Sequence, residues 1–173
     1  MNEAHLQPGD PIEVVRLGDI GKESIDGLLS AYGLSMRTLD PQREIPGSYW
    51  GEDEAGLIGD ELLVREDTPL HSILHETCHY VCMDKDRRQS VHTNAGGDYD
   101  EENAVCYLQI ILADHIENFD RQQMFRDMDS WGYTFRLGSA QIWFEQDADD
   151  AQAFLQDQGI TDGHNQPTFK IRE

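Results

Sequence analysis

The chain has 173 residues, 38% of them hydrophobic and 27% charged, which is enough to build one domain around a hydrophobic core. Its 13 Lys and Arg stand against 34 Asp and Glu, and the resulting net charge of −21 argues against binding to nucleic acids or anionic membranes. The three cysteines form no disulfide framework, no segment approaches the roughly 20 apolar residues of a membrane span, and the first residues lack the features of a secretory signal. We therefore expect a cytoplasmic protein without nucleic-acid or membrane partners, and the oligomeric state stays open.

The N-terminal half of the chain predicts one strand, one helix and one hairpin. Ile12–Leu17 is short and rich in β-branched residues, which is typical of a strand. Ser24–Met36 carries apolar residues at helical spacing, and Gly33 is expected to end that helix. Gly56–Val64 predicts a β-hairpin with its turn at Gly59-Asp60.

The C-terminal half predicts a mainly helical structure. Thr68-Pro69 is a favourable helix start, because Thr can cap a helix and Pro fits its first position. The segments expected to follow are a helix over Leu70–Met83, a polar turn-rich stretch over 84–97, a second helix over about 98–118, and a mostly helical stretch over 121–158 that is interrupted around 132–138. Residues 1–11 and 161–173 are expected to be loose. The expected fold is a single α+β domain, in which a short antiparallel or mixed sheet, including Ile12–Leu17, packs on two helices and the C-terminal part is helical.

The helix over Leu70–Met83 contains the pattern H-E-x-x-H, formed by His75, Glu76 and His79. Residues four apart on a helix differ by about 40° in direction, so both imidazoles project from one face toward a common metal site. Imidazole is a favoured zinc ligand, and Glu76 lies close enough to take a proton from a water at the metal. The plainer interpretation, two unrelated histidines and a surface glutamate, is disfavoured because neighbours such as Ile73 and Val81 predict a largely buried helix.

This pattern resembles the active-site helix of the zincin metallopeptidases. In those enzymes an edge strand holds the substrate backbone, and the hairpin at Gly56–Val64 stands where such a strand is expected. The metzincin clan requires Gly and His three and six residues after the second motif histidine, and this chain has Cys82 and Lys85 there. The resemblance is therefore to zincins that take a glutamate from a following helix, the gluzincin-like arrangement.

The second helix carries a further resemblance. Glu101-x-x-Ala104, followed by Tyr107 and Ile111-Leu112, is similar to the ligand helix of ImmA/IrrE-type minimal metallopeptidases. This resemblance implies a small zincin-like domain that binds one Zn²⁺ per chain. It also implies hydrolysis of a peptide or protein substrate, with Glu76 as the general base.

The third metal ligand is a choice between two adjacent glutamates. Glu101 shares a helix face with several large apolar residues, and a carboxylate on a buried face needs a cation. Glu102 lies on a more polar flank of the same helix. We therefore expect Glu101 to be the ligand and keep Glu102 as the alternative; lesser alternatives are Asp98, Asp100 and His92.

Three further side chains are candidates for contacts with substrate or the transition state. Tyr133 could donate a hydrogen bond to an oxyanion, Arg136 could bind a substrate carboxylate, and His71 precedes His75 by one helical turn. For each of them, ordinary packing or surface exposure is the competing interpretation. The cysteines at 78, 82 and 106 are expected to pack between the two helices.

The sequence therefore predicts a zinc-dependent hydrolase, most specifically a small cytoplasmic metallopeptidase. One rival is a zinc enzyme that hydrolyses a non-peptide amide. The rival from another class is a catalytically silent zinc-binding module with a regulatory or interaction role. Glu76 favours an enzyme, because a module that only binds metal does not need it.

Overall fold

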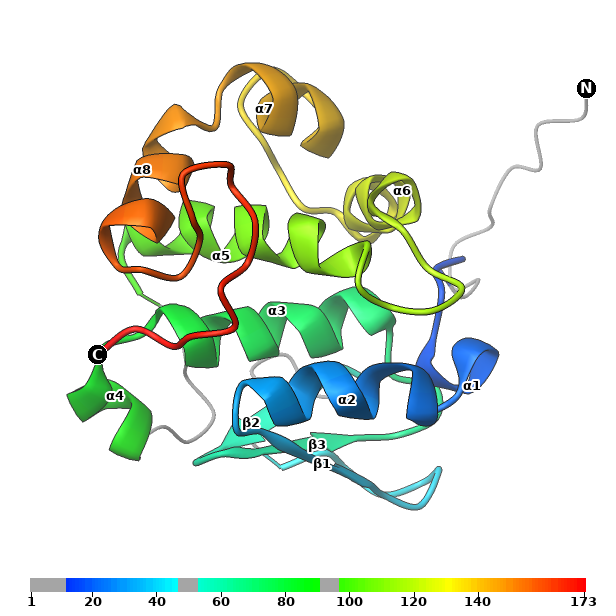
Figure 1. The fold of residues 1–173 in the computed structure, drawn as a ribbon. Helices are drawn as coiled ribbons and strands as arrows, with labels where there is room; N and C mark the ends of the chain where they lie inside the picture. Colours follow the sequence, from blue (N-terminus) through cyan, green and yellow to red (C-terminus); the bar gives the residue numbers. More distant parts are fainter. Residues whose placement is uncertain (1–11, 47–52, 91–96) are drawn as a thin grey trace, which may run out of the picture.

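The computed structural model describes residues 12–46, 53–90 and 97–173, which form an α+β domain as expected (Figure 1). Its elements in chain order are α1 (Leu17–Ile20), α2 (Glu23–Ala31), β1 (Ser35–Thr38), β2 (Gly56–Ile58), β3 (Glu61–Val64), α3 (Leu70–Cys82), α4 (Lys85–Ser90), α5 (Tyr99–Ala113), α6 (Arg121–Trp131), α7 (Ala140–Gln146) and α8 (Asp149–Asp157). In Figure 1 the sheet lies at one end, α3 lies above it, α5 lies above α3, and α6 to α8 cover the far side of α5.

The sheet is small and mixed, with the order β1-β3-β2. β2 and β3 pair antiparallel with Leu57 opposite Leu62, which confirms the predicted hairpin. Gly59 lies at its turn with a φ of 60°, a left-handed conformation that glycine adopts without strain. β1 pairs parallel with β3, and α2 and α3 pack on the sheet.

In the N-terminal region one prediction is wrong and one strand was not predicted. Ile12–Leu17 forms no strand: its backbone makes one bridge, between Arg16 and Pro69, and α1 begins at Leu17. This segment hydrogen-bonds to the start of α3 through Leu70 N to Val15 O at 2.9 Å, so it braces that helix instead of joining the sheet. The helix expected from Ser24 is present as α2 and ends at Ala31, close to the Gly33 expected to end it. The strand β1, which follows at Ser35, was not predicted.

Helices α3 and α5 form the centre of the domain. α3 starts at Leu70 as predicted and ends one residue early, at Cys82. The expected cap is wrong: Pro69 is the N-cap, and the Thr68 hydroxyl accepts a hydrogen bond from the Arg65 amide at 2.8 Å instead of capping α3. α5 begins after Asp98, whose carboxylate accepts a hydrogen bond from the Glu101 amide at 2.9 Å, as a helix cap does. Because α3, α6 and α8 all pack against it, α5 is buried on most of its circumference.

The helical C-terminal part agrees with the prediction, including its interruption. Gly132 ends α6 in the left-handed conformation, and α7 begins only at Ala140. Residues 161–173, expected to be loose, instead run past α5 to the end of α3 (Figure 1). There the Arg172 amide donates to Val81 O at 2.9 Å, and Arg88 donates to the carbonyl oxygen of Arg172. Residues 1–11 lie outside the described part of the chain.

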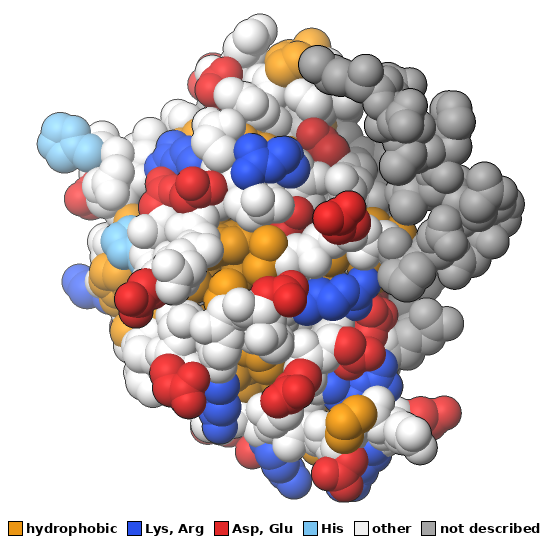
Figure 2. Space-filling view, turned by 90° about the vertical axis from the view of Figure 1, so that its right-hand side faces the viewer, with side chains coloured by type: hydrophobic (Ala, Val, Ile, Leu, Met, Phe, Trp, Pro, Cys, Tyr) orange, Lys and Arg blue, Asp and Glu red, His pale blue; other side chains and the backbone are white. Residues whose placement is uncertain are grey.

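The surface carries both signs of charge. On the face shown in Figure 2, acidic and basic side chains alternate with small hydrophobic areas, so the excess of acidic residues does not form one continuous patch there. No helix in the described ranges combines the length and the apolar composition that a membrane crossing requires.

Candidate metal centre

The two motif histidines meet on one face of α3. The Nε2 atoms of His75 and His79 lie 3.1 Å apart, and their ring centroids are separated by 4.6 Å. This convergence follows from their spacing of four residues on a regular helix. The His79 side chain is only 4% exposed and that of His75 is 21% exposed, so the pair has one buried wall and one side open to solvent.

Glu102 on α5 brings a carboxylate to this pair. Its Oε1 lies 3.0 Å from His79 Nε2, and its Oε2 lies 3.9 Å from His75 Nε2. The three residues each offer a ligand atom, and these atoms lie within 4.8 Å of one another. Tetrahedral coordination at about 2.1 Å would place ligand atoms roughly 3.4 Å apart. The distances of 3.0 to 3.9 Å therefore fit a His-His-Glu group that could hold one metal ion.

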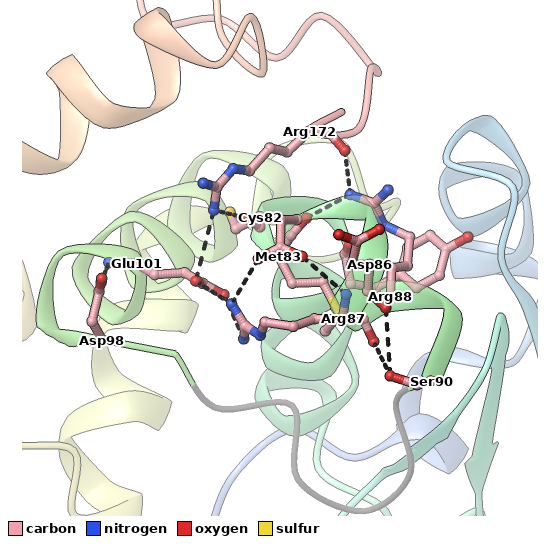
Figure 3. A network of polar contacts seen from close by, with 11 residues as sticks. Cys82, Met83, Asp86, Arg87, Arg88, Ser90, Asp98, Glu101 and Arg172 are labelled. Carbon is pink, nitrogen blue, oxygen red and sulfur yellow. Dashed lines mark hydrogen bonds and ion pairs between the residues drawn. The ribbon is translucent and has the colours of Figure 1, made fainter.

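Glu101 points elsewhere, which corrects the preference for it as the third ligand. Its buried carboxylate accepts two hydrogen bonds from Arg87, at 2.7 and 3.1 Å, and lies 3.8 Å from Arg172 Nη1 (Figure 3). The expectation that a carboxylate on this buried face needs a cation holds. The cations are two arginines, one following α3 and one in the C-terminal segment.

The helix-face argument failed because α5 is surrounded. When apolar residues cover most of a helix, the most apolar stripe does not identify the side that faces one chosen neighbour. The side facing α3 is the stripe of Glu102, Cys106 and Gln109, which is polar within a largely buried helix. For the fully buried Gln109 the available signal was an amide that needs partners, whereas Glu102, 39% exposed, carried no such signal.

The lesser alternatives for the third ligand do not join the group among the described residues. Asp98 caps α5, and Asp100 is exposed. His92 lies outside the described residues.

Gln109 is a site residue that the sequence reasoning missed. It is fully buried on α5, and its Oε1 lies 2.8 Å from His75 Nδ1. Its Nε2 donates to the backbone carbonyl of His71 at 3.0 Å. Gln109 thus joins two successive turns of α3 behind the face that carries His75 and His79.

Glu76 occupies an unusual electrostatic environment. Burial raises the pKa of its carboxyl to about 7, because the opposing effect of His79 is smaller and the carboxylates of Glu102 and Glu54 add to the rise. A carboxyl group with a pKa near neutrality can both accept and donate a proton at physiological pH.

The imidazoles of His75 and His79 differ in basicity. Burial, together with the neighbouring His79, lowers the pKa of His75 to about 4. For His79, burial is outweighed by the hydrogen bond and the charge of Glu102, so its pKa is raised. Glu102 therefore favours the protonated form of His79, whereas burial favours the neutral form of His75.

Of the three candidates for substrate contacts, Tyr133 and His71 lie near the His-His-Glu group and Arg136 lies away from it. The Tyr133 ring lies 5.5 Å from that of His75, and its hydroxyl lies 3.1 Å from Nδ1 of the buried His71. Arg136 instead pairs with Asp147 through two contacts of 2.5 and 2.8 Å. The structure therefore brings Tyr133 and His71 to the edge of the metal centre.

The cysteines lie in the core rather than in the metal-binding group. Cys78 and Cys82 are buried on α3, and Cys106 is half-buried on α5. Burial raises the pKa of all three thiols, which keeps them protonated and unreactive. This agrees with thiols that pack between the two helices.

Comparisons with known protein families, with curated proteins and with solved structures find no match to this chain.

Proposed function

We propose that this protein is a zinc-dependent hydrolase, and most specifically a small metallopeptidase. His75, His79 and Glu102 hold the ion, and Glu76 is the general base. The observation that carries the proposal is the convergence of three ligand atoms from an H-E-x-x-H helix and a second helix. Two nitrogens and one carboxylate oxygen form a ligand set typical of catalytic zinc, which keeps a fourth position open.

In this reaction Glu76 would transfer the proton and Tyr133 would stabilise the developing negative charge. A bound zinc ion would supply Lewis acidity and lower the pKa of a water molecule. Glu76 takes the proton of the attacking water and returns it to the leaving nitrogen as the scissile C–N bond breaks, so that one water is consumed. The raised pKa of Glu76 supports both transfers. Tyr133, packed against His75, supplies a hydroxyl donor for the negative charge that develops on the carbonyl oxygen.

The test compares Glu76→Gln with the unsubstituted protein, both loaded with one equivalent of zinc, on a broad peptide library. We expect the variant to bind zinc as tightly as the unsubstituted protein and to lose peptide cleavage by at least about 100-fold, the usual contribution of a general base. Glu117→Gln, an exposed substitution on the same background, should change neither property.

Three results would contradict the proposal, and the last two would point to its rivals. Equal turnover by Glu76→Gln would reject this mechanism. A protein that holds one zinc and cleaves no peptide, but does hydrolyse small amides, would be an amidohydrolase. One that cleaves neither class of substrate would be a metal-binding module.

A further inference from the structure

We infer that Gln109 is a positioning residue that presets His75 for metal binding, by holding its proton on Nδ1 and leaving the Nε2 lone pair facing the centre. This inference rests on the metal site proposed above. It concerns the metal-free protein as well, so it can be tested separately.

The backbone fixes the orientation of the Gln109 amide. The His71 carbonyl oxygen can only accept a hydrogen bond, so the Gln109 atom 3.0 Å from it must be the nitrogen. The other end of the amide, 2.8 Å from His75 Nδ1, is then the oxygen, which can also only accept. A rotation of the amide by 180° would oppose two acceptors at His71 and is disfavoured.

The tautomer of His75 follows from that orientation. Because Gln109 Oε1 accepts, His75 Nδ1 must carry the hydrogen. In the neutral ring Nε2 then has a lone pair, and this atom lies 3.1 Å from His79 Nε2 and 3.9 Å from Glu102 Oε2. The lone pair is therefore held where the three ligand atoms converge.

The second motif histidine lacks this arrangement. The Nδ1 atom of His79 is buried without a hydrogen-bond partner among the described residues, and its Nε2 contacts Glu102 at 3.0 Å. The two imidazoles therefore differ: the Gln109 amide fixes the hydrogen of His75 on Nδ1, whereas no described residue bonds Nδ1 of His79.

The same face of α5 supplies both the ligand and the positioning residue. Glu102 and Gln109 are seven residues apart, which is about two helical turns and roughly 10 Å. α3 and α5 pack side by side, so Glu102 reaches His79 and Gln109 reaches His75 and the preceding turn. Gln109 is 0% exposed, so water cannot replace it as the acceptor for His75.

Three variants separate positioning from packing. Gln109→Met is similar in size and removes both the acceptor for His75 and the donor to the His71 carbonyl oxygen, whereas Gln109→Glu removes that donor and keeps the acceptor oxygen for His75. Gln152→Met is the matched control, because Gln152 also donates a hydrogen bond to α5, at 3.1 Å from the Tyr107 hydroxyl, away from the metal centre. For each protein, nitrogen-15 NMR reports the tautomer of His75 in the metal-free state at pH 8, and chelator competition gives the zinc Kd.

In the unsubstituted protein and in Gln152→Met we expect His75 as the Nδ1–H tautomer. In Gln109→Met we expect the Nε2–H form to become populated and the zinc Kd to rise 10- to 100-fold. Gln109→Glu should restore the Nδ1–H tautomer and keep the zinc Kd within a few-fold of the unsubstituted protein.

An Nε2–H tautomer in the unsubstituted protein would overturn the inference, and this measurement decides even if a Gln109 variant does not fold. A folded Gln109→Met that binds zinc with unchanged Kd would also overturn it. If the unsubstituted protein holds His75 as Nδ1–H, loses this in Gln109→Met, and binds no zinc, the proposed function fails while the tautomer control by Gln109 stands.

Discussion

The ion pair between Glu101 and Arg87 predicts that Glu101 stabilises the fold and does not bind the metal. The Glu101 side chain is 4% exposed, and Arg87 donates to both of its oxygens. Replacing Arg87 by Met removes these bonds and leaves a carboxylate in the interior. A buried carboxylate without its partner lowers the stability of the fold, because it has lost its hydrating water and no longer has the charged partner that compensated for that loss.

The size of the effect follows from how deeply the pair is buried. Removing one partner of a fully buried pair costs about 3–5 kcal/mol, and exposed pairs contribute about 0–1 kcal/mol. Arg87 is 37% exposed, and Arg172 at 3.8 Å remains to compensate part of the Glu101 charge. We therefore expect Arg87→Met to lower the free energy of unfolding by about 2 kcal/mol, and Glu101→Gln to lower it by about 1 kcal/mol.

Urea unfolding of Arg87→Met, Glu101→Gln and the double variant, each with chelator present, measures these effects and their coupling. A coupling energy of about 1 kcal/mol or more is expected, because each substitution removes the same contact. Zinc affinity of Glu101→Gln should stay within a few-fold of the unsubstituted protein. If Glu101→Gln has unchanged stability and binds zinc more than tenfold more weakly than the unsubstituted protein, the structural role is refuted and Glu101 is the metal ligand.

Three other substitutions are informative. Gly97→Ala should destabilise the protein by about 2 kcal/mol in thermal unfolding, because an added Cβ would meet the carboxylate of Glu101, which its arginine partners hold in place; no loss would show that this segment shifts freely. The pKa of Glu76 is raised from 4.5 to about 7, so its contribution to stability is complete below pH 4.5 and is lost as the pH rises through 7. Metal-free Glu76→Gln should therefore gain roughly 2 kcal/mol over the unsubstituted protein between pH 4 and pH 8, allowing for partial exposure, and equal pH profiles in urea would contradict this. Burial, with smaller effects of His75 and Arg16, lowers the pKa of His71 from 6.5 to about 3, so its contribution is complete above pH 6.5 and is lost as the pH falls. Below pH 6.5 the free energy of unfolding of the metal-free protein should fall less steeply with falling pH in His71→Gln, by at most about 1.4 kcal/mol per pH unit. An unchanged dependence of the free energy of unfolding on pH would count against burial of the neutral ring.

The elements that carry local signals were predictable from the sequence. Thr68-Pro69 marks the start of α3, the paired histidines lie at helical spacing, and Gly59-Asp60 marks the hairpin turn. Each of these signals acts within a few residues, so the rest of the fold does not alter it. The mainly helical C-terminal part was predictable for the same reason, with Gly132 ending α6.

Elements that depend on distant pairing were not predictable. Ile12–Leu17 has the composition of a strand, but it meets the start of α3, and β1 becomes a strand only because β3 lies beside it. Short apolar runs carry no periodicity that separates these outcomes. The tail at 161–173 is polar in sequence and is held to α3 by one backbone hydrogen bond, from Arg172 to Val81, and by the Arg172 side chain, which donates to the Cys82 carbonyl oxygen.

The candidate metal centre also has a part that could be predicted from the sequence and a part that could not. His75 and His79 follow from one motif on one helix, but the choice between Glu101 and Glu102 depends on how α5 is rotated against α3. That rotation is set by packing on several sides of α5, which sequence periodicity does not resolve. Gln109 was not predicted, because the role of its amide comes from its contact with His75 on another helix, which no sequence motif indicates.

Zinc titration of the metal-free protein by calorimetry, alongside Glu102→Gln, tests the central claim most directly. The account predicts one zinc per chain for the unsubstituted protein and an affinity at least about 100-fold weaker in Glu102→Gln, because one of three protein ligands loses its charge. Absence of zinc binding by the unsubstituted protein, or equal affinity in Glu102→Gln, would contradict it.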